Sequence, residues 1–147
     1  MLCERSQELA SKPADINSPA AHQVTGKIGV LLTNLGTPDA PTSSALRRYL
    51  KEFLSDTRVV EIPKLLWWPI LNGIILNTRP KKSAKLYESI WTDRGSPLLK
   101  HTIDQCNAVA NQFYDSQQYG DAETHKNRIL FAYAMRYGNP SIESALQ

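Results

Sequence analysis

Cysteine, glycine and long apolar runs are scarce in this chain of 147 residues, and each shortage excludes a class of protein. Two cysteines, Cys3 and Cys106, are too few for the disulfide framework of a small secreted domain, and they form no C-x-x-C metal or redox motif. Seven glycines and nine prolines exclude a collagen-like or low-complexity chain. No apolar run approaches the roughly 20 residues that a membrane-spanning helix needs.

A large charge excess and a targeting segment are also missing. Lys and Arg number 17 against 14 Asp and Glu, a net charge of +3, so we expect no nucleic-acid partner. The first 26 residues lack the apolar core of a signal peptide, and they carry Glu4, Glu8 and Asp15, which are unusual in organelle transit peptides. We therefore expect a cytoplasmic protein.

Large apolar side chains are well represented. Three Trp, six Tyr and three Phe exclude a fully disordered chain. None of these aromatic residues lies in residues 1–26, which are rich in Ala, Ser, Pro and Asn. We expect residues 1–26 to form a mobile tail and residues 27–147 to form one folded domain.

Two short apolar runs predict strands. Residues 28–32 and 129–135 are too short for helices and end at Gly or Pro, which is typical of strands buried on both faces of a parallel sheet. Residues 59–60, before Pro63, are expected to be extended.

Helical periodicity marks the segments around and between these strands. Residues 46–54 repeat apolar side chains on one face, with Thr42 or Ser43 as the expected N-cap. Residues 79–91 predict a second helix, and a third follows Pro97 with Leu99, Ile103, Cys106, Ala110 and Phe113 as its apolar face. Residues 114–127 are expected to be a loop, and Ser141 is expected to cap a last helix.

Strand, helices, strand and a further helix define an α/β class with an open parallel sheet flanked by helices. The carboxyl ends of parallel strands lie at the same edge, where ligands bind in such folds. Residues 34–37 and residues 136–138, which follow the two apolar runs, should therefore face one cleft.

Three further features admit a functional and a purely structural interpretation. Residues 34–38 lack the glycine and lysine pattern of phosphate-binding loops, so a nucleotide site has little support. Arg79, Lys81, Lys82 and Lys85 are either an anion site or a solvated helix face. The stretch from Leu65 to Leu76 is either a core helix, a pocket wall or a membrane-contacting surface.

The histidines offer no catalytic or metal site. His22, His101 and His125 lack an acid or cysteine partner at ligand spacing. Cys106 lies on an apolar helix face, which favours a small core residue over a nucleophile.

Several motifs, in order along residues 27–147, together resemble the ferrochelatase family, in the style of its bacterial branch. They are Leu31-Leu32-Thr33-Asn34-Leu35-Gly36-Thr37-Pro38, Tyr49-Leu50-Lys51-Glu52-Phe53-Leu54-Ser55-Asp56, Val59-Val60-Glu61-Ile62-Pro63, Arg79-Pro80-Lys81-Lys82-Ser83-Ala84, Gly95-Ser96-Pro97-Leu98-Leu99 and Ala134-Met135-Arg136-Tyr137-Gly138. The resemblance implies a lyase that inserts Fe2+ into protoporphyrin IX in the last step of haem biosynthesis. It also implies two Rossmann-like domains, of which this chain is the first and is incomplete. Fe2+ and the porphyrin are substrates, and no permanently bound cofactor is expected.

The resemblance assigns apolar porphyrin contacts to three residues. Leu35 lies against the macrocycle, and Phe53 and Val59 line the pocket. The stretch from Leu65 to Leu76 corresponds to an apolar lip at the pocket mouth, which suits peripheral membrane contact because porphyrins are poorly soluble.

Five polar or aromatic contacts follow from the same resemblance. Arg79 and Ser96 match positions that hold the propionates, and Tyr87 matches a neighbouring pocket residue. Arg136 and Tyr137 match a pair on the porphyrin face opposite the catalytic histidine, where a role in metal delivery is expected.

The catalytic His and Glu of this family come from its second half, which has no counterpart here. No residue of this chain inherits a catalytic or metal-binding role, and we expect the 147 residues alone to be inactive. The alternative is a non-catalytic porphyrin-binding module.

Overall fold

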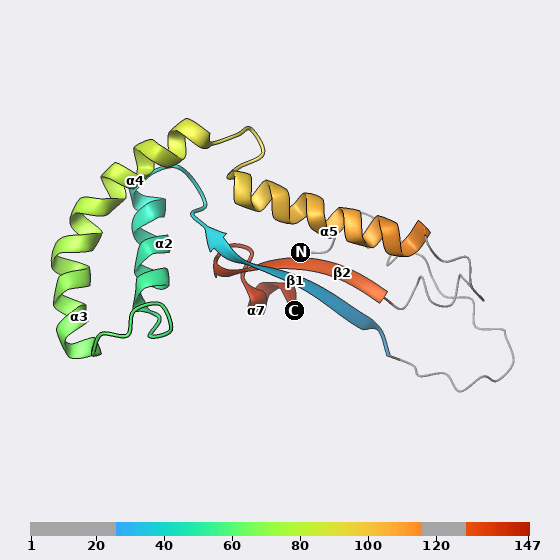
Figure 1. Ribbon diagram of the computed structural model, residues 1–147, viewed down its shortest axis with the longest axis horizontal. Coiled ribbons are helices and arrows are strands. Elements are labelled where there is room, and N and C mark those ends of the chain that lie inside the picture. Colours follow the sequence, from blue (N-terminus) through green and yellow to red (C-terminus); the bar gives the residue numbers. More distant parts are fainter. Residues whose placement is uncertain (1–25, 116–128) are drawn as a thin grey trace, which may run out of the picture.

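The computed structural model describes residues 26–115 and 129–147 (Figure 1). Two ten-residue strands, β1 (Ile28–Thr37) and β2 (Ile129–Gly138), pair in parallel from Ile28 opposite Ile129 to Thr37 opposite Gly138. The open parallel α/β sheet predicted from the apolar runs is thus confirmed. Residues 1–25 of the expected tail, with His22, and residues 116–127 of the expected loop, with His125, lie outside the described residues.

Strand β1 departs from the prediction in burial and in length. Ile28 and Thr33 are exposed and Val30 is half-buried, so β1 is not buried on both faces. Within the described residues β1 pairs only with β2, and α5 covers the face that carries Val30. The strand also continues to Thr37, so residues 34–37 are its last residues and not a turn that follows it.

Helix α5 (Pro97–Asp115) lies along the sheet and closes its core (Figure 1). Its buried residues recur every four positions: Thr102, Cys106, Ala110 and Tyr114. The predicted Cys106 and Ala110 are confirmed and Phe113 packs against them, whereas Leu99 and Ile103 are half-buried and the buried Thr102 and Tyr114 were not predicted.

Hydrogen bonds to the strands explain why polar side chains occupy this face. The Asn34 side-chain amide donates to Thr102 Oγ1 at 3.0 Å, and the Tyr114 hydroxyl donates to the Ile129 carbonyl at 2.7 Å. Tyr114 therefore belongs to the helix and not to a loop. Its ring packs edge-on against Phe131, with centroids 5.8 Å apart.

Helix α2 (Ser43–Ser55) begins where its sequence predicts. The Thr42 side chain accepts a hydrogen bond from the Ala45 amide, which confirms the N-cap. After the helix, residues 59–60 are not extended as expected. The amides of Val59 and Val60 both donate to the Asp56 carbonyl at 3.0 Å, which folds the chain into a turn.

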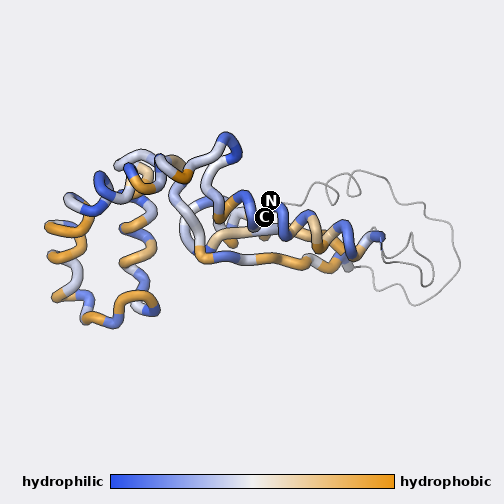
Figure 2. The backbone as a smooth tube through the Cα atoms, turned by 45° about the horizontal axis from the view of Figure 1, so that its top comes forward, coloured by the Kyte–Doolittle hydropathy of each residue, from blue (hydrophilic) through white to orange (hydrophobic). Residues whose placement is uncertain are grey.

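The stretch from Leu65 to Leu76 is helical throughout and runs into the predicted second helix. Helix α3 (Lys64–Ile70), a single wide turn η1 (Leu71–Ile75) and α4 (Leu76–Ile90) follow one another without a break. We call α2, α3, η1 and α4 the helical arm. It lies to one side of the sheet and α5, and Figure 2 shows hydrophobic residues both in this arm and along the strands.

Arg47 explains how α4 tolerates a proline. Pro80 has no N–H to donate to the carbonyl of Leu76, four residues earlier. The Arg47 guanidinium of α2 donates to that carbonyl at 2.6 Å and to the Asn77 side chain at 2.8 Å. The same contacts tie α2 to the start of α4.

One side of the Leu65–Leu76 stretch is core and the other is exposed. Leu71 and Leu76 are buried with Leu54, and the Trp67 indole donates to the Leu54 carbonyl at 2.8 Å. Leu65 is 87% exposed and Trp68 is 54% exposed. The core prediction therefore holds for one side of this stretch only.

The chain ends in the short helix α7 (Ile142–Ala145). The Ser141 side chain accepts a hydrogen bond from the Ser144 amide at 3.1 Å, which confirms the predicted cap. None of the helices in the described ranges is both long enough and apolar enough to cross a bilayer.

Candidate functional site

The carboxyl ends of β1 and β2 meet as the parallel topology predicts. Gly36 lies opposite Tyr137, and Thr37 lies opposite Gly138. Gly36 has φ +116°, and a Cβ atom there would lie 1.9 Å from the Tyr137 carbonyl oxygen. The two strand ends therefore approach more closely than any side chain at residue 36 permits.

Two carboxylates, one helical turn apart on α2, hold the end of β2. The Tyr137 hydroxyl donates to Asp56 Oδ2 at 2.9 Å, and the Arg136 guanidinium contacts the same oxygen at 3.1 Å. The Glu52 carboxylate accepts a hydrogen bond from the Gly138 amide at 3.1 Å. These side chains bring three consecutive residues of β2 against α2.

Aromatic rings fill the space beside this polar cluster. Phe53 packs edge-on against Tyr137, with ring centroids 5.1 Å apart, and stacks with Tyr49 at 5.9 Å. The Tyr49 hydroxyl donates to the Gly36 carbonyl at 3.1 Å. Burial, and then the nearby Tyr87 and Glu52, raise the pKa of Tyr49 to about 12, so this phenol remains a neutral donor at physiological pH.

The cluster keeps Asp56 ionised. A hydrogen bond from the Arg58 amide to Oδ1 at 2.8 Å, followed by those from Tyr137 and Arg136, lowers the pKa of Asp56 to about 2. The Tyr137 hydroxyl, and then Asp56, raise the pKa of Arg136 above its ordinary value. The result is a charged pair, with the Arg136 side chain 45% exposed to solvent.

Three of the eight sequence-predicted site residues come together here: Phe53, Arg136 and Tyr137. Leu35 projects from the end of β1 and is 51% exposed. Val59 is exposed in the turn that follows α2. These residues form an apolar and cationic edge.

The other three predicted residues lie on α4 and at the start of α5. Arg79 is exposed, together with Lys81, Lys82 and Lys85, and Tyr87 is half-buried against Trp91 at 6.3 Å. Ser96 is only 1% exposed, and its hydroxyl accepts a hydrogen bond from the Leu99 amide as the cap of α5. The structure thus gives Ser96 a local role in starting a helix.

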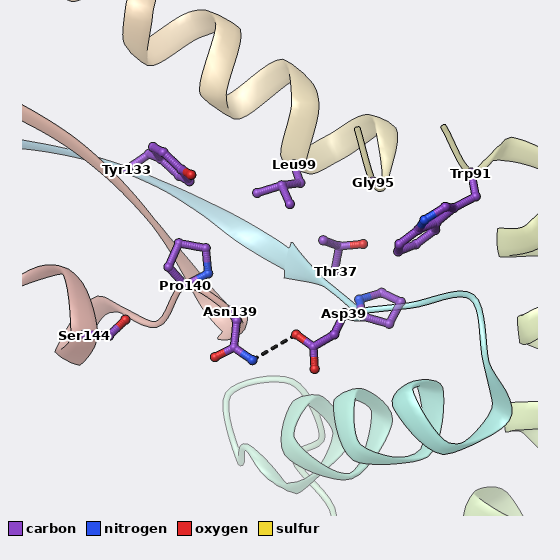
Figure 3. Close-up of a pocket in the computed structure, with 10 residues that line it drawn as sticks. Thr37, Asp39, Trp91, Gly95, Leu99, Tyr133, Asn139, Pro140 and Ser144 are labelled. Carbon is purple, nitrogen blue, oxygen red and sulfur yellow. Dashed lines mark hydrogen bonds between the residues drawn. The ribbon is translucent and has the colours of Figure 1, made fainter. Parts of the chain in front are cut away.

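A cavity of about 420 Å³ lies beside the carboxyl end of β1, and none of the eight residues lines it (Figure 3). Its lining residues include Thr37, Trp91, Leu99 and Tyr133. A second cavity of about 260 Å³ lies along α2, at Tyr49 and Glu52. Both are lined by Thr37, whose buried hydroxyl has no hydrogen-bond partner in the described residues.

Sequence reasoning missed the two acids that organise this edge. Glu52 and Asp56 were parts of a motif with no role attached. Asp56 is the C-cap of α2, where a negative charge opposes the helix dipole. An acid at an unfavourable helix end was the available signal that another group compensates its charge.

A metal site is not formed by protein ligands in the ranges 26–115 and 129–147, because no three His, Cys, Asp or Glu side chains gather in a suitable group. Of the residues discussed as alternatives, His101 is exposed and Cys106 is buried. Both positions agree with the structural interpretation of these residues.

The open parallel sheet flanked by helices defines an α/β domain, with Phe53, Arg136 and Tyr137 gathered at the carboxyl edge of its strands. The ferrochelatase family profile matches residues 27–147. The chain therefore belongs to the ferrochelatase family.

Curated relatives agree over most of this chain. It is 59% identical over 131 residues to the ferrochelatase of Pseudoalteromonas atlantica, covering 89% of this chain and 34% of that protein. It is 58% identical over 135 residues to the ferrochelatase of Chromobacterium violaceum, covering 91% and 35%. The chain thus spans about a third of the length of these relatives. No solved structure matches it.

Proposed function

We propose that this chain supplies the N-terminal part of a ferrochelatase, which inserts Fe2+ into protoporphyrin IX to form protohaem. The observation that carries the proposal is the match over residues 27–147, together with the position of Arg136 and Tyr137 at the carboxyl edge of the sheet. Fe2+ and the porphyrin are substrates in this proposal, and the chain holds no resident cofactor.

A porphyrin is a broad apolar disc with two propionates, and the residue types fit its surface. In this proposal Leu35 and Val59 supply exposed apolar contacts and Phe53 supports them from α2. Arg136 offers its exposed guanidinium to the ring face, and Tyr137 holds its aromatic ring close by. Rigid contacts of this kind use binding energy to orient and distort the disc.

The propionates are assigned to the start of α5 and the side of α4. Arg79 supplies a charge-assisted hydrogen bond from an exposed helix position, and Tyr87 lies two turns further along the same helix. Ser96 lies directly before a helix of 19 residues, whose N-terminus favours negative charge.

Metal insertion forms four bonds from pyrrole nitrogens to Fe2+ and releases the two N–H protons. These protons need an acceptor, and no residue of this chain is assigned that role. General-base catalysis contributes typically about 10²–10⁴-fold. We therefore expect this chain by itself to bind porphyrin without accelerating insertion.

A single titration tests both parts of the proposal. The chain is mixed with protoporphyrin IX, and tryptophan quenching reports binding. Zn2+ is then added as an air-stable substitute for Fe2+, and the shift in porphyrin emission reports insertion. Saturable binding without faster insertion is expected. Acceleration that Arg136→Ala abolishes would refute the assignment of the base to residues outside this chain, and absence of saturable binding would refute the half-pocket.

The exposed side of α3 and η1 is proposed to contact a membrane surface. Leu65, Leu66, Trp68 and Ile74 are all exposed on this short segment. Lys51 lies 6.0 Å above the Trp68 ring, and Lys64 is exposed at the start of α3. Apolar side chains bordered by cations suit the interface of an anionic bilayer.

Flotation with anionic vesicles tests this contact. The variant Leu65→Ser/Trp68→Ser removes exposed apolar groups and is expected to weaken vesicle binding at least about tenfold. Trp67 is left intact because its indole bonds to the Leu54 carbonyl, so its loss would disturb the arm. Val109→Ser, an exposed apolar position on α5, is the control. Equal flotation of all three proteins would refute the contact.

A further inference from the structure

Asp56 accepts side-chain hydrogen bonds from two residues at the end of β2 and so helps to join the helical arm to that strand. Its Oδ2 atom accepts from the Tyr137 hydroxyl at 2.9 Å and from the Arg136 guanidinium at 3.1 Å. Its Oδ1 atom accepts from the Arg58 amide at 2.8 Å. One carboxylate thus satisfies donors from the turn after α2 and from two adjacent residues of β2.

The Arg58 amide bonds to the Asp56 carboxylate on the side away from Arg136 and Tyr137, at Oδ1 and not Oδ2. This bond closes a short turn between Asp56 and residue 58, and the Asp56 carbonyl accepts the amides of Val59 and Val60 in the same segment. The side chain of Asp56 is 18% exposed. The backbone bond therefore fixes Oδ1 and leaves Oδ2 to accept from Arg136 and Tyr137.

A fixed acceptor restricts both of its partners. The Tyr137 hydroxyl directs its hydrogen to Oδ2, while the ring is held edge-on by Phe53 at 5.1 Å. The Arg136 guanidinium is bound through one amino group and lies 5.7 Å from the Tyr137 ring. A long arginine side chain otherwise loses considerable rotamer freedom when a ligand immobilises it.

We propose that Asp56 is a positioning residue, which holds Arg136 and Tyr137 in the arrangement that receives the porphyrin without touching the porphyrin itself. This inference rests on the proposed function. It adds a residue from α2 to the site and explains why α2, distant in sequence from the end of β2, is part of the binding edge.

The test compares protoporphyrin IX affinity among variants of the 147-residue chain. Asp56→Asn keeps the size of the side chain and removes its charge and one acceptor, and it is expected to weaken binding about three- to tenfold. Asp56→Glu keeps the charge but displaces it by one methylene, so a smaller loss is expected. Glu61→Gln is the matched control, because its exposed carboxylate makes no hydrogen bond or ion pair to any described residue.

A double-mutant cycle separates positioning from general stabilisation. In a chain that already carries Arg136→Ala and Tyr137→Phe, Asp56→Asn is expected to cause no further loss of affinity. A residue that only stabilised the fold would weaken binding in either background. Circular dichroism verifies that each variant is folded. If Asp56→Asn does not fold, the comparison is made with Asp56→Glu.

The outcomes distinguish this inference from the function on which it rests. If the wild-type chain binds porphyrin and the folded Asp56 variants bind it with the same affinity, the positioning role is overturned and the proposed function stays intact. An equal loss in both backgrounds would also overturn it. Absence of porphyrin binding by the wild-type chain would overturn both proposals.

Discussion

The sheet with α5 and the helical arm have cores of different kinds. Cys106, Ala110, Tyr114 and Phe131 form the core under α5, with partly buried side chains from both strands around them. Leu54, Leu71 and Leu76 form the central cluster of the arm, with partly buried side chains from α2, α3 and η1 around them, while Leu65 and Trp68 on the same stretch remain exposed.

This difference indicates which region stabilises the fold and which region is available for binding. The sheet and α5 join segments that are far apart in sequence through ring packing and buried hydrogen bonds. Within the arm, helix α3 has no buried residue and presents apolar side chains outward. Regions with few buried contacts open more readily, and binding surfaces are commonly drawn from them. The candidate site lies where the arm meets the sheet.

Substitution at Gly36 should have the largest effect, because it separates the two strand ends at that junction. Gly36→Ala places a Cβ atom 1.9 Å from a backbone oxygen at a positive φ, and we expect a loss of about 4 kcal/mol in the free energy of unfolding. Gly29→Ala has nothing within 4 Å of the new Cβ and should change stability little. Urea denaturation measures the stability of both variants. Equal midpoints would contradict the special role of Gly36 where the two strand ends meet.

Removal of the arm core should be the next largest effect. Leu71→Ala deletes a fully buried side chain and is expected to cost about 3 kcal/mol. Hydrogen exchange should show faster opening of α3 and α4 than of β1, β2 and α5. Leu65→Ala on the same stretch should change stability by less than about 0.5 kcal/mol, since Leu65 is exposed. Uniform acceleration across all elements would mean that the two regions unfold as one unit.

The link between α2 and α4 should contribute less. Arg47→Met leaves the Leu76 carbonyl without its donor, so we expect a loss of about 1 kcal/mol. Arg48→Met is the control, because among the described residues Arg48 makes only an exposed 3.4 Å ion pair with Asp39. Thermal unfolding should rank Arg47→Met below Arg48→Met in stability. The reverse order would refute the role of Arg47 at Pro80.

Asp56 contributes to the stability of the fold throughout the neutral pH range, and this contribution disappears only in acid. Its pKa is lowered from 3.8 to about 2 in the folded chain, so the folded state binds the proton more weakly than the unfolded state. The stabilisation is complete above about pH 4 and is lost as the pH falls toward 2. Asp56→Asn should flatten the fall in stability between these values, whereas Glu61→Gln should retain it.

Local patterns predicted most elements, and long-range contacts explain the differences. The apolar runs located both strands, and Thr42 and Ser141 capped helices as expected. The second helix was predicted from residue 79, whereas α4 begins at Leu76, and the chain alone does not show that Arg47 replaces the donor that Pro80 lacks. The predicted apolar face of α5 contributes Cys106, Ala110 and Phe113 to the core, but Thr102 was missed because its burial depends on a bond from Asn34.

The candidate site also has a part that the sequence predicted and a part that depends on long-range contacts. Parallel topology placed residues 34–37 beside residues 136–138, and the register confirms it. The role of Asp56 depends on a contact across 80 positions of sequence, which no local pattern reveals. The porphyrin contacts of the eight assigned residues remain predictions.

The most direct test of the central claim is the affinity of protoporphyrin IX for the wild-type chain and for Arg136→Ala, measured by tryptophan quenching. Arg94→Ala is the control, because within ranges 26–115 and 129–147 Arg94 forms only an exposed ion pair with Asp104 at 3.3 Å. We expect saturable binding by the wild type and by Arg94→Ala, with at least about tenfold weaker binding by Arg136→Ala. Equal affinity in all three proteins, or no saturable binding by any of them, would contradict it.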